Sequence, residues 1–191
     1  LLRWATYASV TTATLLIAGK LTAALLTGSV SVLASLVDSM MDVAASIINL
    51  LAVHYSLQPP DREHRFGHGK AEPLAGLAQA AFIAGSALFL ILQAVNRLLH
   101  PQPLVDALVG VGVLLFAIIA TGVLLAFQHH VIRRTESTAI RADALHYATV
   151  LLTNAATIVA LGLAMLGWPT MDPVFAIGIA LYIMYNAGHI A

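Results

Sequence analysis

The sequence contains no cysteine, and only 9 % of its 191 residues are Asp, Glu, Lys or Arg. Ordinary soluble domains carry about 25 % charged residues. Without cysteine the chain has no disulfides, no thiolate metal sites and no cysteine nucleophile, so any metal must be bound by His, Asp or Glu. Nine basic residues balance nine acidic ones, which argues against binding to nucleic acid because no positive field would hold a phosphate backbone.

Apolar residues are abundant instead, and 60 % of the chain falls in this class. A bilayer core requires about 20 apolar residues per helix. Turn-forming residues divide the chain into runs of about that length, at residues 4–26, 30–57, 73–99, 105–127, 138–166 and 173–190. A soluble helical core is the alternative, but such runs would leave no polar face for water. We therefore predict an all-α membrane protein, with a single domain of six transmembrane helices over residues 1–191.

Basic residues predict how the spans are oriented in the membrane. They gather in the second and fourth loops, at Arg62, Arg65, Lys70, Arg133, Arg134 and Arg141. On the opposite side of the predicted membrane lies Arg97. Cytoplasmic loops of membrane proteins carry an excess of Lys and Arg. Both basic loops and both chain termini are therefore expected in the cytoplasm.

The second predicted span carries a polar stripe. Asp38 and Asp42 are four residues apart, so both carboxylates lie on one face of a helix. The same face continues through Ser31, Ser35, Ser46 and Asn49. Two ionised side chains at membrane depth cost roughly 5–7 kcal/mol on insertion scales, so the stripe is expected to face the bundle interior or a wet cavity. The alternative is hydrogen bonding between helices, with Lys20 as a counter-ion.

The fifth predicted span repeats this pattern with one apolar member. Its stripe consists of Asp143, His146, Val150, Thr153 and Thr157. A helix that starts near Thr138, with Ser137 as its cap, places His146 at the depth of the two aspartates. Two carboxylates and one imidazole suit a divalent first-row metal. The residues thus predict an intramembrane metal site formed by Asp38, Asp42 and His146.

Four strings of the sequence carry a resemblance to a known family. They are Thr27-Gly28-Ser29, Val37-Asp38-Ser39 followed by Asp42, Phe66-Gly67-His68-Gly69-Lys70-Ala71-Glu72, and Ala142-Asp143-Ala144-Leu145-His146-Tyr147. In this order they resemble the cation diffusion facilitator family, most closely its bacterial zinc and ferrous-iron efflux proteins. The similarity covers essentially the whole chain. It implies a homodimeric, proton-coupled exporter of divalent metal in the bacterial inner (plasma) membrane.

The resemblance also implies a tetrahedral transport site between the second and fifth helices. In that family an Asp-x-x-x-Asp pair and a His-x-x-x-Asp pair supply the ligands. Here Asp38, Asp42 and His146 match the first three ligands, and Val150 stands at the fourth position. A hydrophobic residue cannot ligate a metal, so this departure affects both affinity and selectivity.

Three explanations fit the apolar residue at position 150. Water fills the fourth corner, a nearby group such as Asp143 or Asn154 substitutes, or the chain is a variant with weakened transport. The last of these defines the alternative function, a transport-impaired metal-binding membrane protein.

The loop after the second predicted span holds Asp61, His64 and His68 at a spacing of three and four residues. Taken alone, this segment reads as a solvated basic loop. The resemblance implies that the three side chains form a second, loop-borne zinc site. Because Gly67 and Gly69 flank His68 and basic residues lie nearby, only modest affinity is expected.

The family usually carries a soluble cytoplasmic domain after its sixth helix, and we expect the present chain to lack it. Enzyme functions fit poorly, because no His-Glu-x-x-His string occurs and two aspartates on one helix cannot readily share a proton as in an aspartyl protease. The main prediction is a secondary transporter that exports zinc, ferrous iron or a similar ion in exchange for protons by alternating access.

Overall fold

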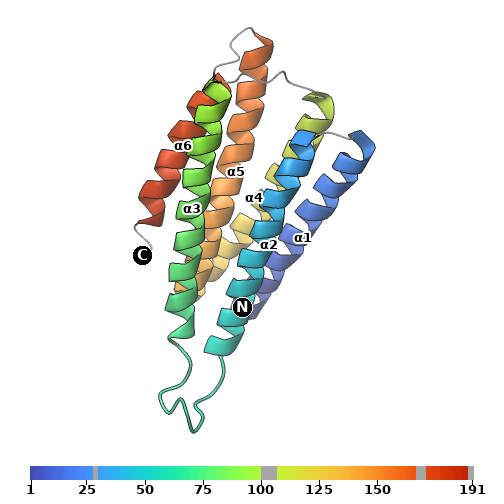
Figure 1. Cartoon of the computed structure of the whole chain (residues 1–191). Helices are drawn as coiled ribbons and strands as arrows, with labels where there is room; N and C mark the ends of the chain where they lie inside the picture. The colour runs from blue at the N-terminus through green and yellow to red at the C-terminus, as the bar shows by residue number, and fades with distance from the viewer. Residues whose placement is uncertain (28–29, 100–106, 167–170, 189–191) are drawn as a thin grey trace.

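The computed structural model describes residues 1–27, 30–99, 107–166 and 171–188. Within these ranges every regular element is an α-helix, and the predicted six helices are confirmed as one bundle (Figure 1). The helices are α1 (Leu2–Thr27), α2 (Val30–Ser56), α3 (Ala71–Leu99), α4 (Ala107–Thr135), α5 (Thr138–Met165) and α6 (Met171–Ala187). The long connection between α2 and α3 extends beyond one end of the bundle (Figure 1).

Helix α5 occupies the centre of the bundle, because it contacts every other helix. Around it, α1 packs on α2 and α4, and α3 packs on α6. Gly76 lies where α3 meets the start of α5: a Cβ added there would be 3.7 Å from the carbonyl oxygen of Thr138, an ordinary van der Waals distance. Polar side chains on the inward face of α5 therefore meet polar side chains of several helices.

The connection between α4 and α5 differs from the prediction. We expected a break over residues 128–137, but α4 continues to Thr135 and only Glu136, with φ of 51°, leaves the helix before Ser137. Polar and basic residues do not end a helix that extends beyond the apolar layer, and Arg133 and Arg134 interact favourably with its C-terminal dipole. The predicted cap is confirmed, because Ser137 Oγ accepts a hydrogen bond from the backbone N–H of Ile140 at 3.2 Å.

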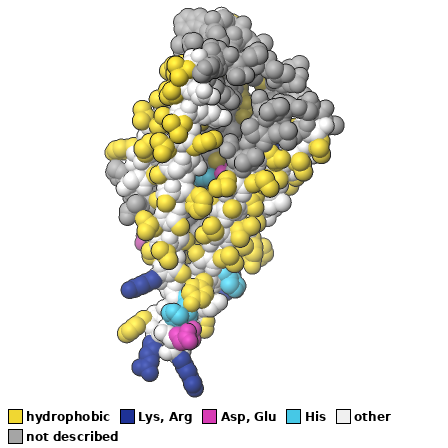
Figure 2. Space-filling view, in the orientation of Figure 1, with side chains coloured by type: hydrophobic (Ala, Val, Ile, Leu, Met, Phe, Trp, Pro, Cys, Tyr) yellow, Lys and Arg dark blue, Asp and Glu magenta, His cyan; other side chains and the backbone are white. Residues whose placement is uncertain are grey.

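Apolar side chains cover the outside of the bundle. Figure 2 shows them over its body, whereas Lys and Arg side chains gather toward the end that carries the α2–α3 connection. Among the described residues, two stretches are long and apolar enough to cross a membrane, Ala71–Asn96 and Val111–Thr135, and the apolar stretch Pro173–Ala187 is shorter. This distribution matches a bundle surrounded by lipid rather than water.

Candidate metal sites

The first candidate site lies between α2 and α5, inside the bundle. His146 Nε2 is 3.1 Å from Asp42 Oδ1, and the two side chains are 9 % and 20 % exposed. Ligand atoms about 2.0–2.1 Å from a tetrahedral zinc ion lie roughly 3.3–3.4 Å apart. The structure therefore brings two of the three predicted ligands to nearly the separation that one shared metal ion requires.

The third predicted ligand is Asp38, one helical turn before Asp42 in α2. Its side chain lies outside the described residues. The adjacent Ser39 is buried and accepts a hydrogen bond from Lys20 Nζ at 2.7 Å. The lysine that we considered as a counter-ion thus contacts α2 at the position next to Asp38.

No carboxylate or imidazole joins Asp42 and His146 as a further ligand in the described part of the chain. Val150 is half-buried in α5, one turn after His146. Asp143 is not a substitute here, because Asp143, Asp42 and His146 do not bring one ligand atom each within 4.8 Å of one another. Of the explanations left open by the sequence, three stay compatible with the structure: water, Asn154, which is half-buried in α5, and a variant with weakened transport.

Asp143 instead belongs to a buried polar network next to this site. Ser9 Oγ of α1 and Gln128 Nε2 of α4 both donate to Asp143 Oδ2, at 2.5 and 2.7 Å. The Tyr147 hydroxyl donates to the carbonyl oxygen of Ser9 at 3.0 Å and lies 2.9 Å from Ser46 Oγ of α2. Hydrogen bonds of this network thus connect α1, α2, α4 and α5 next to His146.

Sequence reasoning missed three members of this network: Ser9, Gln128 and Tyr147. Gln128 was placed in a predicted loop, so its position on a helix face was not considered. Ser9 is a small polar residue in an apolar span, and such residues more often satisfy their hydroxyl within their own helix. Ser9 Oγ also lies 3.1 Å from the carbonyl oxygen of Ala5, and its single proton is donated either there or to Asp143. A signal was present for Gln128. It lies three residues before the apolar Val131, so a helix continued past residue 127 would place both side chains on one face.

The second candidate site lies in the α2–α3 connection. Asp61, His64 and His68 bring one ligand atom each within 4.8 Å of one another, which no other trio of His or acidic residues does in the described ranges. His64 Nδ1 is 3.3 Å from Asp61 Oδ1, and His68 Nε2 is 3.4 Å from Asp61 Oδ2. These separations match the spacing of tetrahedral zinc ligands given above.

Local contacts hold the loop ligands in place. The ring of Tyr55 packs edge-on against His68, with ring centroids 4.3 Å apart. The side chain of His68 is buried, and neither of its ring nitrogens has a hydrogen-bond partner. In the turn between His64 and His68, Gly67 has a φ of 80°, a backbone conformation that residues other than glycine rarely adopt. A metal ion would satisfy the buried imidazole.

Hydrogen bonds from the loop backbone favour the ionised form of the Asp61 carboxyl. Its Oδ1 accepts hydrogen bonds from the backbone N–H groups of Glu63 and His64, at 2.9 and 2.5 Å. The hydrogen bond from His64 lowers the pKa of Asp61 below its usual value, against a smaller opposing effect of desolvation. An ionised carboxylate is the form that binds a metal.

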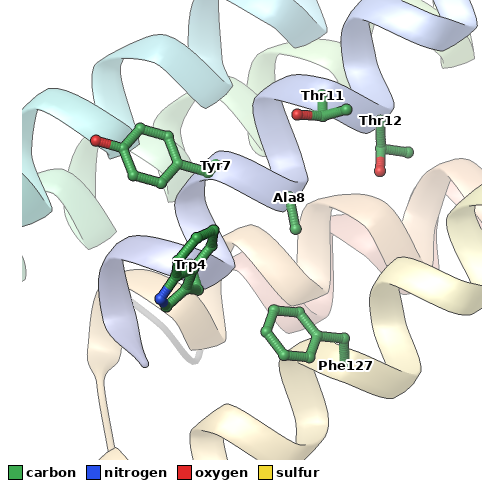
Figure 3. A pocket seen from close by; sticks show the side chains of 6 residues that line it. All are labelled: Trp4, Tyr7, Ala8, Thr11, Thr12 and Phe127. Atoms are coloured by element: carbon green, nitrogen blue, oxygen red, sulfur yellow. The ribbon is translucent and has the colours of Figure 1, made fainter.

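A surface hollow between α1 and α4 carries no such chemistry. It has a volume of about 430 Å³, and Figure 3 shows its lining. The lining residues are Trp4, Tyr7, Ala8, Thr11, Thr12 and Phe127. They offer three hydroxyls, two from threonine and one from tyrosine, and no imidazole or carboxylate. Their aromatic rings suit contact with lipid at the membrane interface.

Comparison with known proteins identifies the family of the chain. Residues 6–191 match a family described as the cation efflux transmembrane domain. Over 161 residues, or 84 % of this chain, the sequence is 56 % identical to proteins named cation-efflux pump FieF from Salmonella arizonae, Salmonella newport and Salmonella heidelberg. The match covers 54 % of each of these relatives. The chain thus spans about half the length of the curated relatives it matches.

Proposed function

The chain belongs to the cation efflux family, and from this membership we propose that it exports divalent metal cations across a membrane in exchange for protons. The family is one of transporters rather than enzymes, which sets aside the protease functions weighed on the sequence. Zinc, ferrous iron or a similar ion is the proposed cargo, because imidazole and carboxylate together suit these metals.

One observation carries the proposal: Asp42 and His146, on two helices, meet at 3.1 Å inside an apolar bundle. Ionisable groups at membrane depth are costly and mark ion pathways. Asp38 is proposed as the third ligand. Together the three side chains would bind one ion, and a rearrangement of α2 against α5 would open the site to either side of the membrane in turn.

Protons compete with the metal for these same ligands. Carboxylates and imidazole must lose their protons to bind a metal, so binding releases protons and protonation releases the metal. A proton gradient could therefore drive export. With Val150 in place of a fourth ligand, we propose that water completes the coordination, which weakens affinity but leaves exchange possible.

For the loop we propose a second bound metal ion, held by Asp61, His64 and His68. It lies outside the bundle and would not move with the cargo. The fit of the loop ligands to tetrahedral zinc supports this role.

We further propose that both termini and the loop site face the cytoplasm of a bacterial inner membrane, and that the protein acts as a homodimer. The basic residues of the α2–α3 and α4–α5 connections support the orientation. The dimer rests on the resemblance to the efflux family alone.

Metal flux into proteoliposomes tests the proposed function. We expect zinc uptake by vesicles with an acidic interior, and no uptake once an ionophore collapses the pH gradient. Binding of zinc without flux in either condition would favour the alternative, a transport-impaired metal-binding protein, for which the apolar residue at position 150 is the motivating observation.

A further inference from the structure

Asp143 is a fully buried carboxyl that neither proposed metal site uses. Around it stand Ser9 from α1, Asn49 from α2 and Gln128 from α4. All three side chains are uncharged, and each is buried as well. A buried carboxylate is costly unless a cation or several donors compensate its charge.

Among the described residues, the ionisable groups near Asp143 include no Lys or Arg, and only a protonated imidazole of His146 would offset part of a charge on Asp143. On α5 these are His146 and Tyr147, and on α2 it is Asp42, which lies against His146. The groups that face Asp143 from α1 and α4 are the neutral Ser9 and Gln128. Among the described residues, no Lys or Arg forms an ion pair with Asp143.

Hydrogen bonds distinguish the two oxygens of the Asp143 carboxyl. Oδ2 accepts from both Ser9 Oγ and Gln128 Nε2, whereas Oδ1 has no partner. Gln128 Oε1, the other half of the same amide, is also buried without a partner. An ionised carboxyl would leave both of these buried acceptors without a donor. A protonated carboxyl can donate from Oδ1 to Oε1 and so close a reciprocal pair with the amide.

We propose that Asp143 is a proton-binding site of this protein, paired with Gln128, whose proton is released when a metal ion binds at Asp42 and His146. The inference rests on the proposed function and extends it to a residue outside the metal site. A divalent cation one helical turn away favours the ionised carboxyl, because opposite charges attract strongly in a medium of low dielectric constant.

The exchange step balances as a simple proton transfer. The O–H bond at Oδ1 breaks, its electron pair stays on the carboxylate, and the proton passes to water on the side of the membrane to which the site is open. The carboxylate then offsets part of the added positive charge of the metal. When the metal leaves, Asp143 takes up a proton again. The protein thereby regains a proton-binding carboxyl that Val150 does not provide.

Infrared spectroscopy of the purified full chain tests whether Asp143 holds a proton. The metal-free protein at neutral pH should show the carbonyl band of a protonated carboxyl. Addition of zinc should decrease this band, and the band should be missing in Asp143→Asn. Gln128→Met, which removes the amide partner but keeps the carboxyl, should shift the band instead. Absence of the band from the metal-free wild type would overturn the proposal.

Proton release on zinc binding tests the exchange itself. In weakly buffered solution, Asp143→Asn should release fewer protons per bound zinc ion than the wild type. Glu136→Gln, which removes an exposed carboxyl in the α4–α5 connection, should release as many as the wild type. If Asp143→Asn and the wild type release equal numbers of protons per zinc ion while zinc flux is intact, the proton exchange at Asp143 is overturned. The proposed transport function then still stands. A wild type that neither binds nor moves zinc overturns the proposed function and the exchange with it.

Discussion

The two candidate metal sites are built in opposite ways. Asp61, His64 and His68 lie within one connection, and backbone hydrogen bonds and the Tyr55 ring position them locally. Asp42 and His146 are more than a hundred residues apart and meet only because α2 and α5 pack together. A local site keeps its geometry when helices move, whereas a site between helices changes whenever they do. This difference suits a resident ion in the loop and a transported ion in the bundle.

The largest expected effect tests the site between the helices. Asp42→Ala removes a ligand with a full charge, so zinc flux into proteoliposomes should fall to the level of empty vesicles. Met41→Ala, at an exposed position next to Asp42, should transport zinc at the wild-type rate. Wild-type flux in Asp42→Ala would contradict the assignment of the cargo site to Asp42 and His146. It would indicate that the loop site binds the transported ion.

Completing the same site should strengthen it. Val150→Asp adds a carboxylate one helical turn after His146, and a tenfold gain in zinc affinity requires only about 1.4 kcal/mol. Binding should also be lost more steeply on acidification, because one more ligand must be deprotonated. Calorimetric titration at several pH values measures both effects.

Val150→Thr has nearly the shape of valine without a carboxylate and serves as the control. If the Asp and Thr variants bind zinc alike, position 150 does not face the ion.

The loop site should affect transport only in part. His64→Ala combined with His68→Ala should lower the zinc content by one ion per protomer and reduce flux a few-fold, because the cargo ligands remain. Zinc content is measured by elemental analysis and flux in proteoliposomes. His130→Ala, which removes an exposed imidazole from α4, should change neither quantity. A complete loss of flux in the double variant would show that the loop carries the cargo.

The smallest expected effect is the dependence of the stability of the α2–α3 loop on pH. The pKa of Asp61 is lowered in the folded loop, so ionised Asp61 stabilises the loop above its ordinary pKa, and this contribution is lost as the pH falls through the folded value. The effect should be small because the side chain is 53 % exposed. The carboxyl resonance of Asp61, followed by NMR, should titrate below the usual range for aspartate. A titration at or above that range would contradict the backbone hydrogen bonds.

Much of the fold could be predicted because helices depend on residue patterns that are local along the chain. Apolar runs identified the helices, and Ser137 marked the start of α5. The spacing of polar residues also identified inward-facing positions, since Ser46, Asn49 and His146 are buried. The predicted end of α4 was wrong. Polar residues were interpreted as the end of the helix, whereas the helix continues beyond the apolar layer there.

The grouping of the polar residues around Asp143 could not be predicted in the same way. A helical period tells which residues share a face but not which neighbour that face meets. Asp143 and His146 share one stripe of α5, yet His146 meets Asp42 of α2 while Asp143 meets Ser9 and Gln128. Because α5 contacts every other helix, small differences of angle around its axis select different partners.

By itself, the sequence determined six apolar helices, their polar faces, and a loop whose ligands are close because they are close along the chain. The sequence also predicted that Asp42 and His146 share one site. Only the tertiary structure decided that Asp143 pairs with an amide of α4 instead of joining them. The physical reason is that local structure depends on neighbours a few residues away. A buried charge depends on whichever groups packing places beside it, and it is stable only where those groups compensate it.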